Sequence, residues 1–216
     1  MSREEQGSSD KQFYAVFDGA FRTKVREDYP DAIKRINKLG TQVYERELKA
    51  IFGRIENVAI EDSDYGKQIK ITLDKNDEGK YPVLAFGVES KNGRDVLKKL
   101  PGIDFSKDVR VMPYRFTPED QTDERSGVSI TQEDAEGNFK VKVENFFFDG
   151  VNKKYLHEFP TIDWDSATES EQKIYKIQRD EFLLKYVETN VLPRFAEKPV
   201  QNTYPTEEIR PEDIPF

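Results

Sequence analysis

Apolar and polar positions alternate in short runs near the start of the chain, which predicts β-strands. Phe13 to Phe17 and Phe21 to Val25 flank an Asp18-Gly19 dipeptide, and Asp-Gly between two such runs is a strong hairpin signal. Residues 30–40 are polar and predict turns, whereas residues 42–60 are rich in branched side chains and predict a long β-stretch. We therefore expect an N-terminal hairpin followed by a strand-rich domain.

The pattern continues through the middle of the chain with one interruption. Residues 67–73 alternate with period two, which indicates a strand with one buried face. The later elements expected are strands at 81–88, 109–116, 127–131 and 138–148, and a short helix at 93–100 that ends before Pro101-Gly102. The resulting order, three strands, a helix and two strands, is that of an OB-fold barrel. Any other small β-barrel or β-sandwich fits the same periodicity.

A long amphipathic helix is expected after the strands. Ser166 and Glu169 have the spacing of a capping box at its start, and Pro193 ends it. The helix at 166–192 has an apolar stripe made of Ile174, Ile177, Leu184, Val187 and Val191. The fold class predicted is mainly β: an OB-fold-like barrel elaborated by the N-terminal hairpin and this C-terminal helix.

Three segments follow from this division of the chain. Residues 1–12 are polar and are expected to be disordered. Residues 13–195 form the folded domain. Residues 196–216 contain repeated prolines and scattered acids and predict a flexible acidic tail.

Composition limits the classes of function. The net charge is -8, which argues against binding a polyanion over the whole surface, but the charge is uneven. Residues 13–116 carry 20 Lys/Arg and 17 Asp/Glu, whereas residues 117–170 carry 5 and 13. The chain has no cysteine, no apolar run long enough to cross a membrane and no signal peptide at its start. We expect a soluble, cytoplasmic protein.

The sequence contains few candidate residues for enzymatic catalysis. His157 is the single histidine, and its sequence neighbours predict a partly buried packing residue. The acidic run at 74–79 begins like a calcium loop, but Ala85 stands where a bidentate glutamate is needed, so a hairpin turn is expected. The acidic run at 61–64 likewise predicts a solvated turn. We assign no catalytic residue, metal ligand or cofactor.

Residues 49–116 interleave cationic and aromatic side chains. Proteins that bind single-stranded nucleic acid combine a cationic groove with aromatic platforms on which unpaired bases stack. The candidate DNA-binding residues are Lys49, Phe52, Arg54, Tyr65, Lys67, Lys70, Tyr81, Phe86, Lys91, Arg94, Arg110, Tyr114, Arg115 and Phe116. Most phenylalanines are expected in the core on hydrophobicity alone, and the cations fit a solvated outer face equally well.

Phe146, Phe147 and Phe148 are consecutive, and neighbouring strand residues face opposite ways. At least one of these rings is therefore expected to point away from the core. The C-terminal helix, a second subunit and nucleic-acid bases are the three partners considered for it.

The last five residues, Glu212, Asp213, Ile214, Pro215 and Phe216, combine acids, an apolar plug and a free carboxylate. An end of this kind is suited to capture in an apolar pocket rimmed by basic groups. These residues are the candidate partner-binding site.

The tip Asp213-Ile214-Pro215-Phe216 resembles the end of bacterial single-stranded DNA-binding proteins. The body is similar to single-stranded DNA-binding proteins of tailed bacteriophages in four short stretches: Ile33–Gly40, Asp64–Lys67, Leu100–Asp104 and the Trp164-Asp165 helix start. This resemblance implies an OB-fold that holds DNA and a tip that docks replication, repair and recombination enzymes. It also implies the host bacterial cytoplasm for a phage-encoded protein.

The chain departs from the bacterial pattern in its short linker, its long N-terminal hairpin and its C-terminal helix. Tetramerisation and a DNA-contact set are therefore not transferred, and a monomer or dimer is favoured. The expected function is sequence-independent binding of single-stranded DNA, with recruitment of a polymerase, primase or helicase. A recombination mediator or strand-annealing protein, and an interaction scaffold that binds protein alone, are the alternatives.

Overall fold

The computed structural model describes residues 10–36, 40–64, 66–119 and 121–196. The disorder expected for residues 1–12 and 196–216 is wrong at the inner ends of these segments, because Lys11 and Gln12 begin β1 and Ala196 ends α3. Residues 1–9 and 197–216, which include the acidic tip, lie outside the described residues. The strands are β1 (Lys11–Phe17), β2 (Ala20–Lys24), β3 (Ile33–Ile36), β4 (Gln42–Leu48), β5 (Ile51–Ser63), β6 (Gly66–Leu73), β7 (Tyr81–Gly87), β8 (Asp108–Phe116), β9 (Arg125–Gln132), β10 (Val141–Lys142), β11 (Phe148–Asp149) and β12 (Lys154–Tyr155). The helices are α1 (Lys91–Lys99), α2 (Glu169–Asn190) and α3 (Pro193–Ala196), with a 3-10 turn at Leu100–Gly102. The protein is mainly β, as predicted.

The order of the central elements is confirmed, and three details of the prediction are wrong. Residues 33–36, expected in a turn, form β3, and the stretch 42–60 is divided into β4 and β5. The strand expected at 138–148 is reduced to the two residues of β10. The chain leaves the sheet there because the backbone N–H of Phe146 donates to Lys98 of α1 at 2.9 Å. The side-chain oxygen of Asn145 also accepts the N–H of Phe147 at 3.0 Å.

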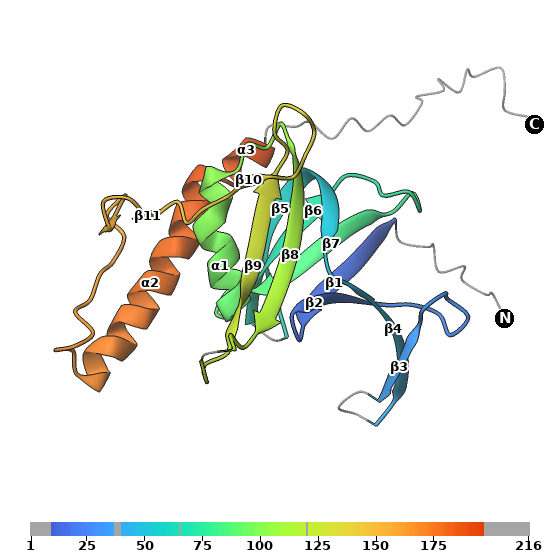
Figure 1. Ribbon diagram of the computed structural model, residues 1–216, viewed down its shortest axis with the longest axis horizontal. Coiled ribbons are helices and arrows are strands. Elements are labelled where there is room, and N and C mark those ends of the chain that lie inside the picture. Colours follow the sequence, from blue (N-terminus) through green and yellow to red (C-terminus); the bar gives the residue numbers. More distant parts are fainter. Residues whose placement is uncertain (1–9, 37–39, 65, 120, 197–216) are drawn as a thin grey trace, which may run out of the picture.

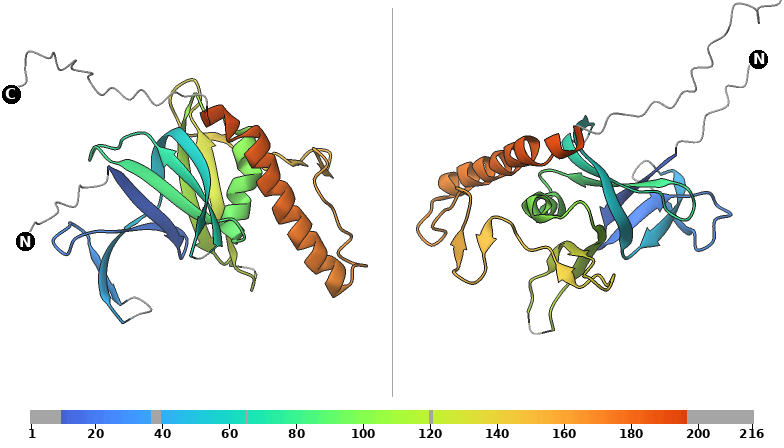
Figure 2. Two further views of the ribbon diagram at one scale, coloured as in Figure 1. Left: turned by 180° about the vertical axis from the view of Figure 1, so that it is seen from behind. Right: turned by 90° about the horizontal axis from the view of Figure 1, so that it is seen from above.

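The described strands β1 to β10 form one sheet in the order β10-β9-β8-β5-β6-β7-β1-β2-β4-β3. The predicted closed barrel is wrong, because the end strands β10 and β3 of this sheet are not paired with each other. The reason lies in β1, which runs parallel to β7 and occupies its free edge. β2, β4 and β3 then extend the sheet beyond this edge. Figures 1 and 2 show α1 and α2 side by side on one flank of the molecule and the β3–β4 hairpin at the opposite end.

The open sheet still curls, so that the β1–β2 turn meets the end of β8. A Cβ atom at Gly19 would lie 2.7 Å from the backbone nitrogen of Arg115, and Gly19 has a φ of +77°. Only glycine meets both conditions without strain. The Arg115 guanidinium also pairs with Asp18 at 2.7 Å. The hairpin predicted from Asp18-Gly19 is confirmed, and its turn holds the two halves of the sheet together.

A β-bulge lets both halves of the long strand β5 place side chains in the core. Ile51 and Ile55 point inward in the first half of the strand. The register with β6 shifts between Ile55 and Asn57, after which Val58 points inward. One extra residue exchanges the inward and outward positions of a strand. The outer face of β5 therefore carries even-numbered residues before the bulge and odd-numbered residues after it.

Helix α2 begins at Glu169 and is capped by Thr168 instead of the predicted Ser166. The N–H of Glu171 donates to Thr168 Oγ1 at 3.3 Å, and the N–H of Thr168 donates to the Glu171 carboxylate at 2.8 Å. The capping box is thus shifted by two residues. Ser166 instead donates its hydroxyl to Asp163 at 2.9 Å.

The predicted apolar stripe of α2 is correct only in its second half. Ile174 and Ile177 are 53% and 58% exposed, whereas Tyr175, Leu183 and Val187 are buried. The buried positions are spaced in multiples of four, so they follow one face of the helix. The prediction included Val187 but placed Ile174 and Leu184 on this face, where Tyr175 and Leu183 lie.

The three consecutive phenylalanines pack in different directions. Phe147 is fully buried, and Phe146 contacts Tyr186 of α2 with ring centroids 5.8 Å apart. The C-terminal helix is thus the partner of Phe146 among the alternatives considered. His157, predicted to be partly buried, is exposed and stacks on Phe146 at 4.4 Å with an angle of 5°.

The burial of Leu183 predicts that α2 contributes strongly to stability. Leu183→Ala removes a fully buried side chain and should lower the free energy of unfolding by about 2–5 kcal/mol. Ile177→Ala on the exposed side of the same helix is the control and should change it by under about 0.5 kcal/mol. Urea denaturation followed by circular dichroism measures both values. Equal effects of the two changes would show that α2 does not pack as described.

Candidate nucleic-acid interface

A groove of about 670 Å³ runs over the outer face of β1 and its neighbours β2 and β7. Its position follows from the alternation of β1, in which Tyr14 and Val16 face the core while Phe13, Ala15 and Phe17 face outward. Tyr14 is buried in the core, and this burial raises the pKa of its hydroxyl to about 12. The outward face of β1 is therefore the floor of the groove.

Two half-exposed phenylalanines stand on this floor. Phe13 is 50% exposed and Phe17 is 52% exposed. They are four residues apart on one strand, which separates them by about 13 Å. Between them lie the small side chains of Ala15 and of Ala85, which is paired with Ala15 across β1 and β7. The rings thus border a low, open stretch of sheet.

Cationic side chains are placed against both rings. The guanidinium carbon of Arg22 lies 4.3 Å from the ring centroid of Phe17, and that of Arg35 lies 5.6 Å away. The ammonium nitrogen of Lys70 lies 5.7 Å from the ring of Phe13. Contacts of this length are within the range of cation–π attraction. Each ring therefore has a positive charge beside it.

The same cations take part in ion pairs that hold them in place. Arg22 pairs with Glu47 at 2.9 Å and Lys70 with Glu61 at 2.5 Å, and these pairs are partly exposed. Exposed ion pairs contribute about 0–1 kcal/mol, so exchanging such a carboxylate for a phosphate costs little. The cations are oriented without being strongly neutralised.

The Arg35–Glu45 pair is more rigid. Arg35 donates from Nε at 3.0 Å and from a terminal nitrogen at 2.6 Å to the two carboxylate oxygens of Glu45. These hydrogen bonds raise the pKa of Arg35 above its ordinary value. Only 10% of the Glu45 side chain is exposed, whereas 38% of the Arg35 side chain is. The pair presents the cation to solvent and covers the carboxylate.

The groove as a whole is positive. The cations that line it are Lys11, Arg22, Lys24, Arg35 and Lys70. Among the lining residues, all of which the structure describes, Glu45 is the one acid. Gln12 also contributes a buried Oε1 that has no hydrogen-bond partner within the described chain. The groove thus offers two aromatic platforms, several cations and one spare acceptor.

Of the predicted DNA-binding residues, Lys70 lies in this groove. Five others share the outer face of β5 and β8, a different part of the sheet. These five are Phe52, Arg54, Arg110, Tyr114 and Phe116. Arg115 points away from that face and joins Asp18 at 2.7 Å to Glu124 at 2.5 Å, so its first role is to tie the β1–β2 turn to β8.

The remaining predicted residues are dispersed. Phe86 is only 3% exposed and belongs to the core, so its prediction as a DNA contact is wrong. Arg94 reaches Asp180 of α2 at 3.4 Å, Lys67 pairs with Asp62 at 3.3 Å, and Tyr81 lies under Lys75. Lys49 and Lys91 are exposed at the ends of β4 and α1. Tyr65 lies outside the described residues.

The sequence interpretation missed Phe13, Phe17, Arg22 and Arg35. A usable signal was present, because a two-residue turn at Asp18-Gly19 fixes the pairing of Ala15 with Arg22. That pairing places Arg22 on the same face as Phe13 and Phe17. The stretch in which cations and aromatics interleave, residues 49–116, lies after the hairpin in the sequence, so the candidate residues did not include it.

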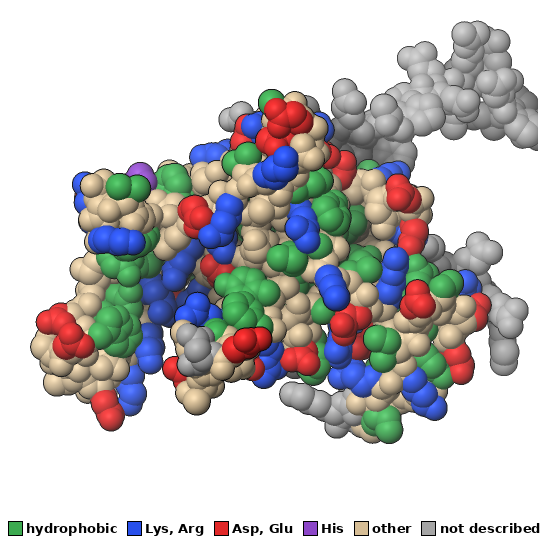
Figure 3. Space-filling model, in the orientation of Figure 1, with side chains coloured by type: hydrophobic (Ala, Val, Ile, Leu, Met, Phe, Trp, Pro, Cys, Tyr) green, Lys and Arg blue, Asp and Glu red, His purple; other side chains and the backbone are tan. Residues whose placement is uncertain are grey.

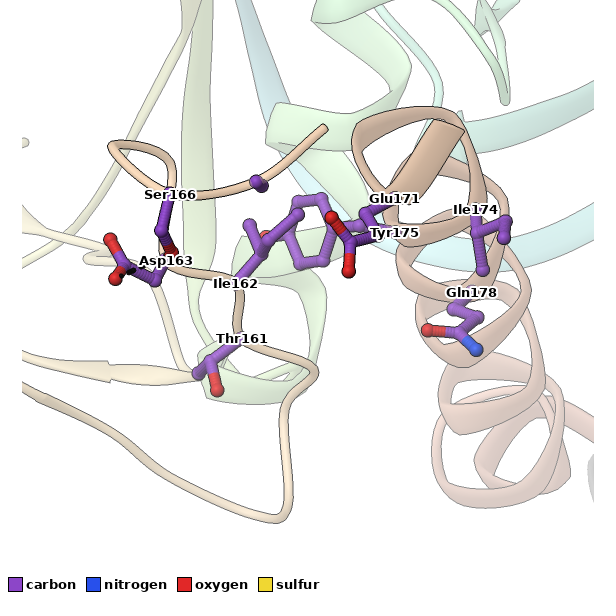
Figure 4. A pocket seen from close by; sticks show the side chains of 9 residues that line it. Thr161, Ile162, Asp163, Ser166, Glu171, Ile174, Tyr175 and Gln178 are labelled. Carbon is purple, nitrogen blue, oxygen red and sulfur yellow. Dashed lines mark hydrogen bonds between the residues drawn. The ribbon is translucent and has the colours of Figure 1, made fainter. Parts of the chain in front are cut away.

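Two other hollows are less suited to an anionic ligand. The first, of about 310 Å³, lies between the segment 161–167 and the start of α2, and Figure 4 shows Asp163 and Glu171 among the side chains that line it. None of its described lining residues is basic. The second, of about 390 Å³, lies beside β4 and β5 and is rich in acids, with Asp74, Asp77 and Glu78 among its lining residues.

Comparison of the chain with protein-family models, with curated proteins and with solved structures finds no match. Within the described ranges no group of three or more histidine, aspartate and glutamate side chains is arranged to hold a metal ion. In the same ranges no helix has both the length and the apolar content needed to cross a bilayer.

Proposed function

We propose that this protein binds single-stranded DNA without sequence preference, with bases stacked on Phe13 and Phe17 and the backbone held by the surrounding cations. The observation that carries the proposal is the pair of half-exposed rings with Arg22, Arg35 and Lys70 beside them. Stacking requires bases whose faces are free, which favours a single strand over a duplex. Because every base has such a face, the site is tolerant of sequence.

The arrangement of the sheet supports the proposal. We further propose that β5 to β9 with α1 represent an OB-type barrel that has been opened. The pairs β5–β6, β6–β7, β5–β8 and β8–β9, with α1 between β7 and β8, keep the expected order. OB-folds bind oligonucleotides on the face of their second and third strands. Those strands correspond to β6 and β7, which supply Lys70 and Ala85 to the groove.

The resemblance of the C-terminal tip to that of bacterial single-stranded DNA-binding proteins agrees with this function. In the proposal, Glu212, Asp213, Ile214, Pro215 and Phe216 recruit a replication protein such as a polymerase, primase or helicase. No catalytic step and no cofactor are needed for this activity.

A titration with oligo-dT tests the function. Fluorescence anisotropy should show binding at low salt that weakens as salt increases, because phosphate contacts release counterions. A duplex of the same length should bind more weakly, since its bases present no free faces. Absence of oligo-dT binding at low salt would refute the proposal and leave the protein-only scaffold as the interpretation.

Stacking on Phe17 predicts a specific loss of affinity. Phe17→Leu keeps an apolar side chain on the strand but removes the ring, and should lower affinity for oligo-dT about tenfold. Trp164→Leu is the matched control, because Trp164 is 49% exposed and lies near α2, far along the chain from the groove. The same titration measures both variants, and equal affinity of Phe17→Leu and the unaltered protein would exclude Phe17 as a platform.

Phosphate contact by Arg22 predicts a change in salt dependence. Arg22→Ala should reduce the slope of log affinity against log salt by about 0.7, the value for one phosphate contact of a single strand. Lys176→Ala on the exposed side of α2 makes the same change in charge and should leave the slope unaltered. An unchanged slope in Arg22→Ala would place the phosphates elsewhere.

Deletion of residues 207–216 separates recruitment from DNA binding. The deletion removes negative charge from the surroundings of the DNA, so affinity for oligo-dT should stay the same or increase. Co-purification of a replication enzyme with the protein should be lost. A large drop in DNA affinity would contradict the assignment of the tip to partner binding.

A further inference from the structure

A second cluster of aromatic and cationic side chains lies on the outer face of β5, β8 and β9. Phe52 of β5 is directly opposite Arg110 of β8, and Arg110 is opposite Thr131 of β9. Phe52 is 52% exposed, and the guanidinium carbon of Arg110 lies 5.7 Å from its ring centroid. Phe139, from the loop between β9 and β10, meets Phe52 edge-to-face at 5.1 Å. This group is called the Phe52 cluster below.

Two polar atoms of the Phe52 cluster lack partners. Arg110 Nε and Thr131 Oγ1 are buried and make no hydrogen bond within the described chain. A terminal nitrogen of Arg110 reaches only the sulfur of Met112 at 3.4 Å. Arg110 also has no ion pair among the described residues, whereas its neighbour Arg54 pairs with Asp108 at 3.1 Å. A buried polar atom without a hydrogen-bond partner destabilises the fold, and a bound anion or polar ligand would offset this cost.

The cluster continues along β8 toward the groove. Met112, Tyr114 and Phe116 share the outer face with Arg110, because the alternate residues of β8 point into the core. Phe116 is 51% exposed and its ring lies 5.9 Å from that of Tyr114. Figure 3 shows hydrophobic and Lys/Arg side chains intermixed on the side of the molecule where β8 and β9 lie in front. The outer face of β8 is therefore a strip that carries two aromatic rings, the cation of Arg110 and, at its start, the acid Asp108.

The strip and the groove adjoin at the β1–β2 turn. Phe17 is the last residue of β1, and Gly19, two residues further on, lies against the backbone of Tyr114 and Arg115 at the end of β8. This contact is made on the Arg115 side of β8, opposite to Tyr114 and Phe116, so a DNA strand that leaves Phe17 reaches Phe116 by passing around the end of β8. Following β8 from there leads to Arg110 and Phe52.

We infer that the Phe52 cluster is a second nucleotide-binding subsite, which takes a base on Phe52 and a phosphate on Arg110 of the same DNA strand that occupies the groove. The inference rests on the proposed function. It extends the DNA path from the face of β6 and β7 onto the face of β5 and β8. Short oligonucleotides would fill the groove alone, and longer ones would reach both places.

Oligonucleotide length separates the two parts of the path. Affinities are measured for oligo-dT from about 4 to about 16 nucleotides, the range of site sizes for one OB-fold. Phe52→Leu and Arg110→Gln should leave the affinity for the shortest oligonucleotide that binds unchanged. Both should lower affinity for the longest about tenfold. Lys176→Gln on the exposed side of α2 is the control, because it removes an equal charge from a surface outside the proposed DNA path.

Two results would overturn the inference, and they differ in what they imply for the proposed function. Equal binding of long oligo-dT by both variants and the unaltered protein, with Phe17→Leu still weakened, would remove the second subsite and leave the proposed function. Loss of affinity for short and long oligo-dT alike would place Phe52 and Arg110 in the groove site or in the fold. Thermal unfolding separates these two causes, because only a loss of the fold lowers the unfolding temperature strongly. If Phe52→Leu unfolds, Phe139→Leu replaces it in the length series, and if Arg110→Gln unfolds, Arg110→Lys replaces it. Failure of the unaltered protein to bind any length would refute both proposals.

Discussion

The parallel pairing of β1 with β7 determines both the shape of the sheet and the position of the candidate interface. It occupies the edge of β7, and the sheet accordingly continues into β2, β4 and β3 instead of closing on itself. The same pairing places the outward side of β1 beside the outer faces of β6 and β7. Phe13 and Phe17 therefore lie in one groove with Ala85 and Lys70. The β1–β2 turn then fixes this extension against β8, since glycine at position 19 allows close backbone contact. One strand pairing thus explains the open sheet and the location of the aromatic platforms.

A protein with a net charge of -8 needs a local arrangement of charge to bind a polyanion. In the groove, the Arg35–Glu45 pair has such an arrangement, with the cation directed outward and the acid covered. Arg35 is held by both oxygens of Glu45, and Glu45 is almost completely covered while Arg35 remains open to solvent. Arg22 is held differently, between one oxygen of Glu47 and the ring of Phe17, and in this pair the carboxylate is the more exposed partner. Oriented cations of this kind lose little conformational entropy when a phosphate binds, which offsets the cost of competing with their carboxylates.

The local elements were largely predictable from the sequence, whereas their assembly was not. The Asp18-Gly19 turn, the strands around it and the helix before Pro101 follow from short-range rules. The periodicity of the sequence does not determine which strand β1 pairs with, because that pairing joins residues far apart in the chain. Closure into a barrel was therefore wrongly expected. Phe86 and Phe52 look alike in the sequence, yet one is in the core and the other half-exposed. Register decides between them, and the bulge in β5 shows how one extra residue reverses it.

The central claim is that single-stranded DNA lies across the outward face of β1. Photo-crosslinking with an oligo-dT in which single thymines are replaced by 5-iodouracil tests this directly, because the activated base reacts with the aromatic ring on which it stacks. Mass spectrometry of the crosslinked peptides should identify Phe13 and Phe17 as attachment points. Crosslinks confined to α2 or to the segment between β9 and α2, with none on β1, would contradict the account.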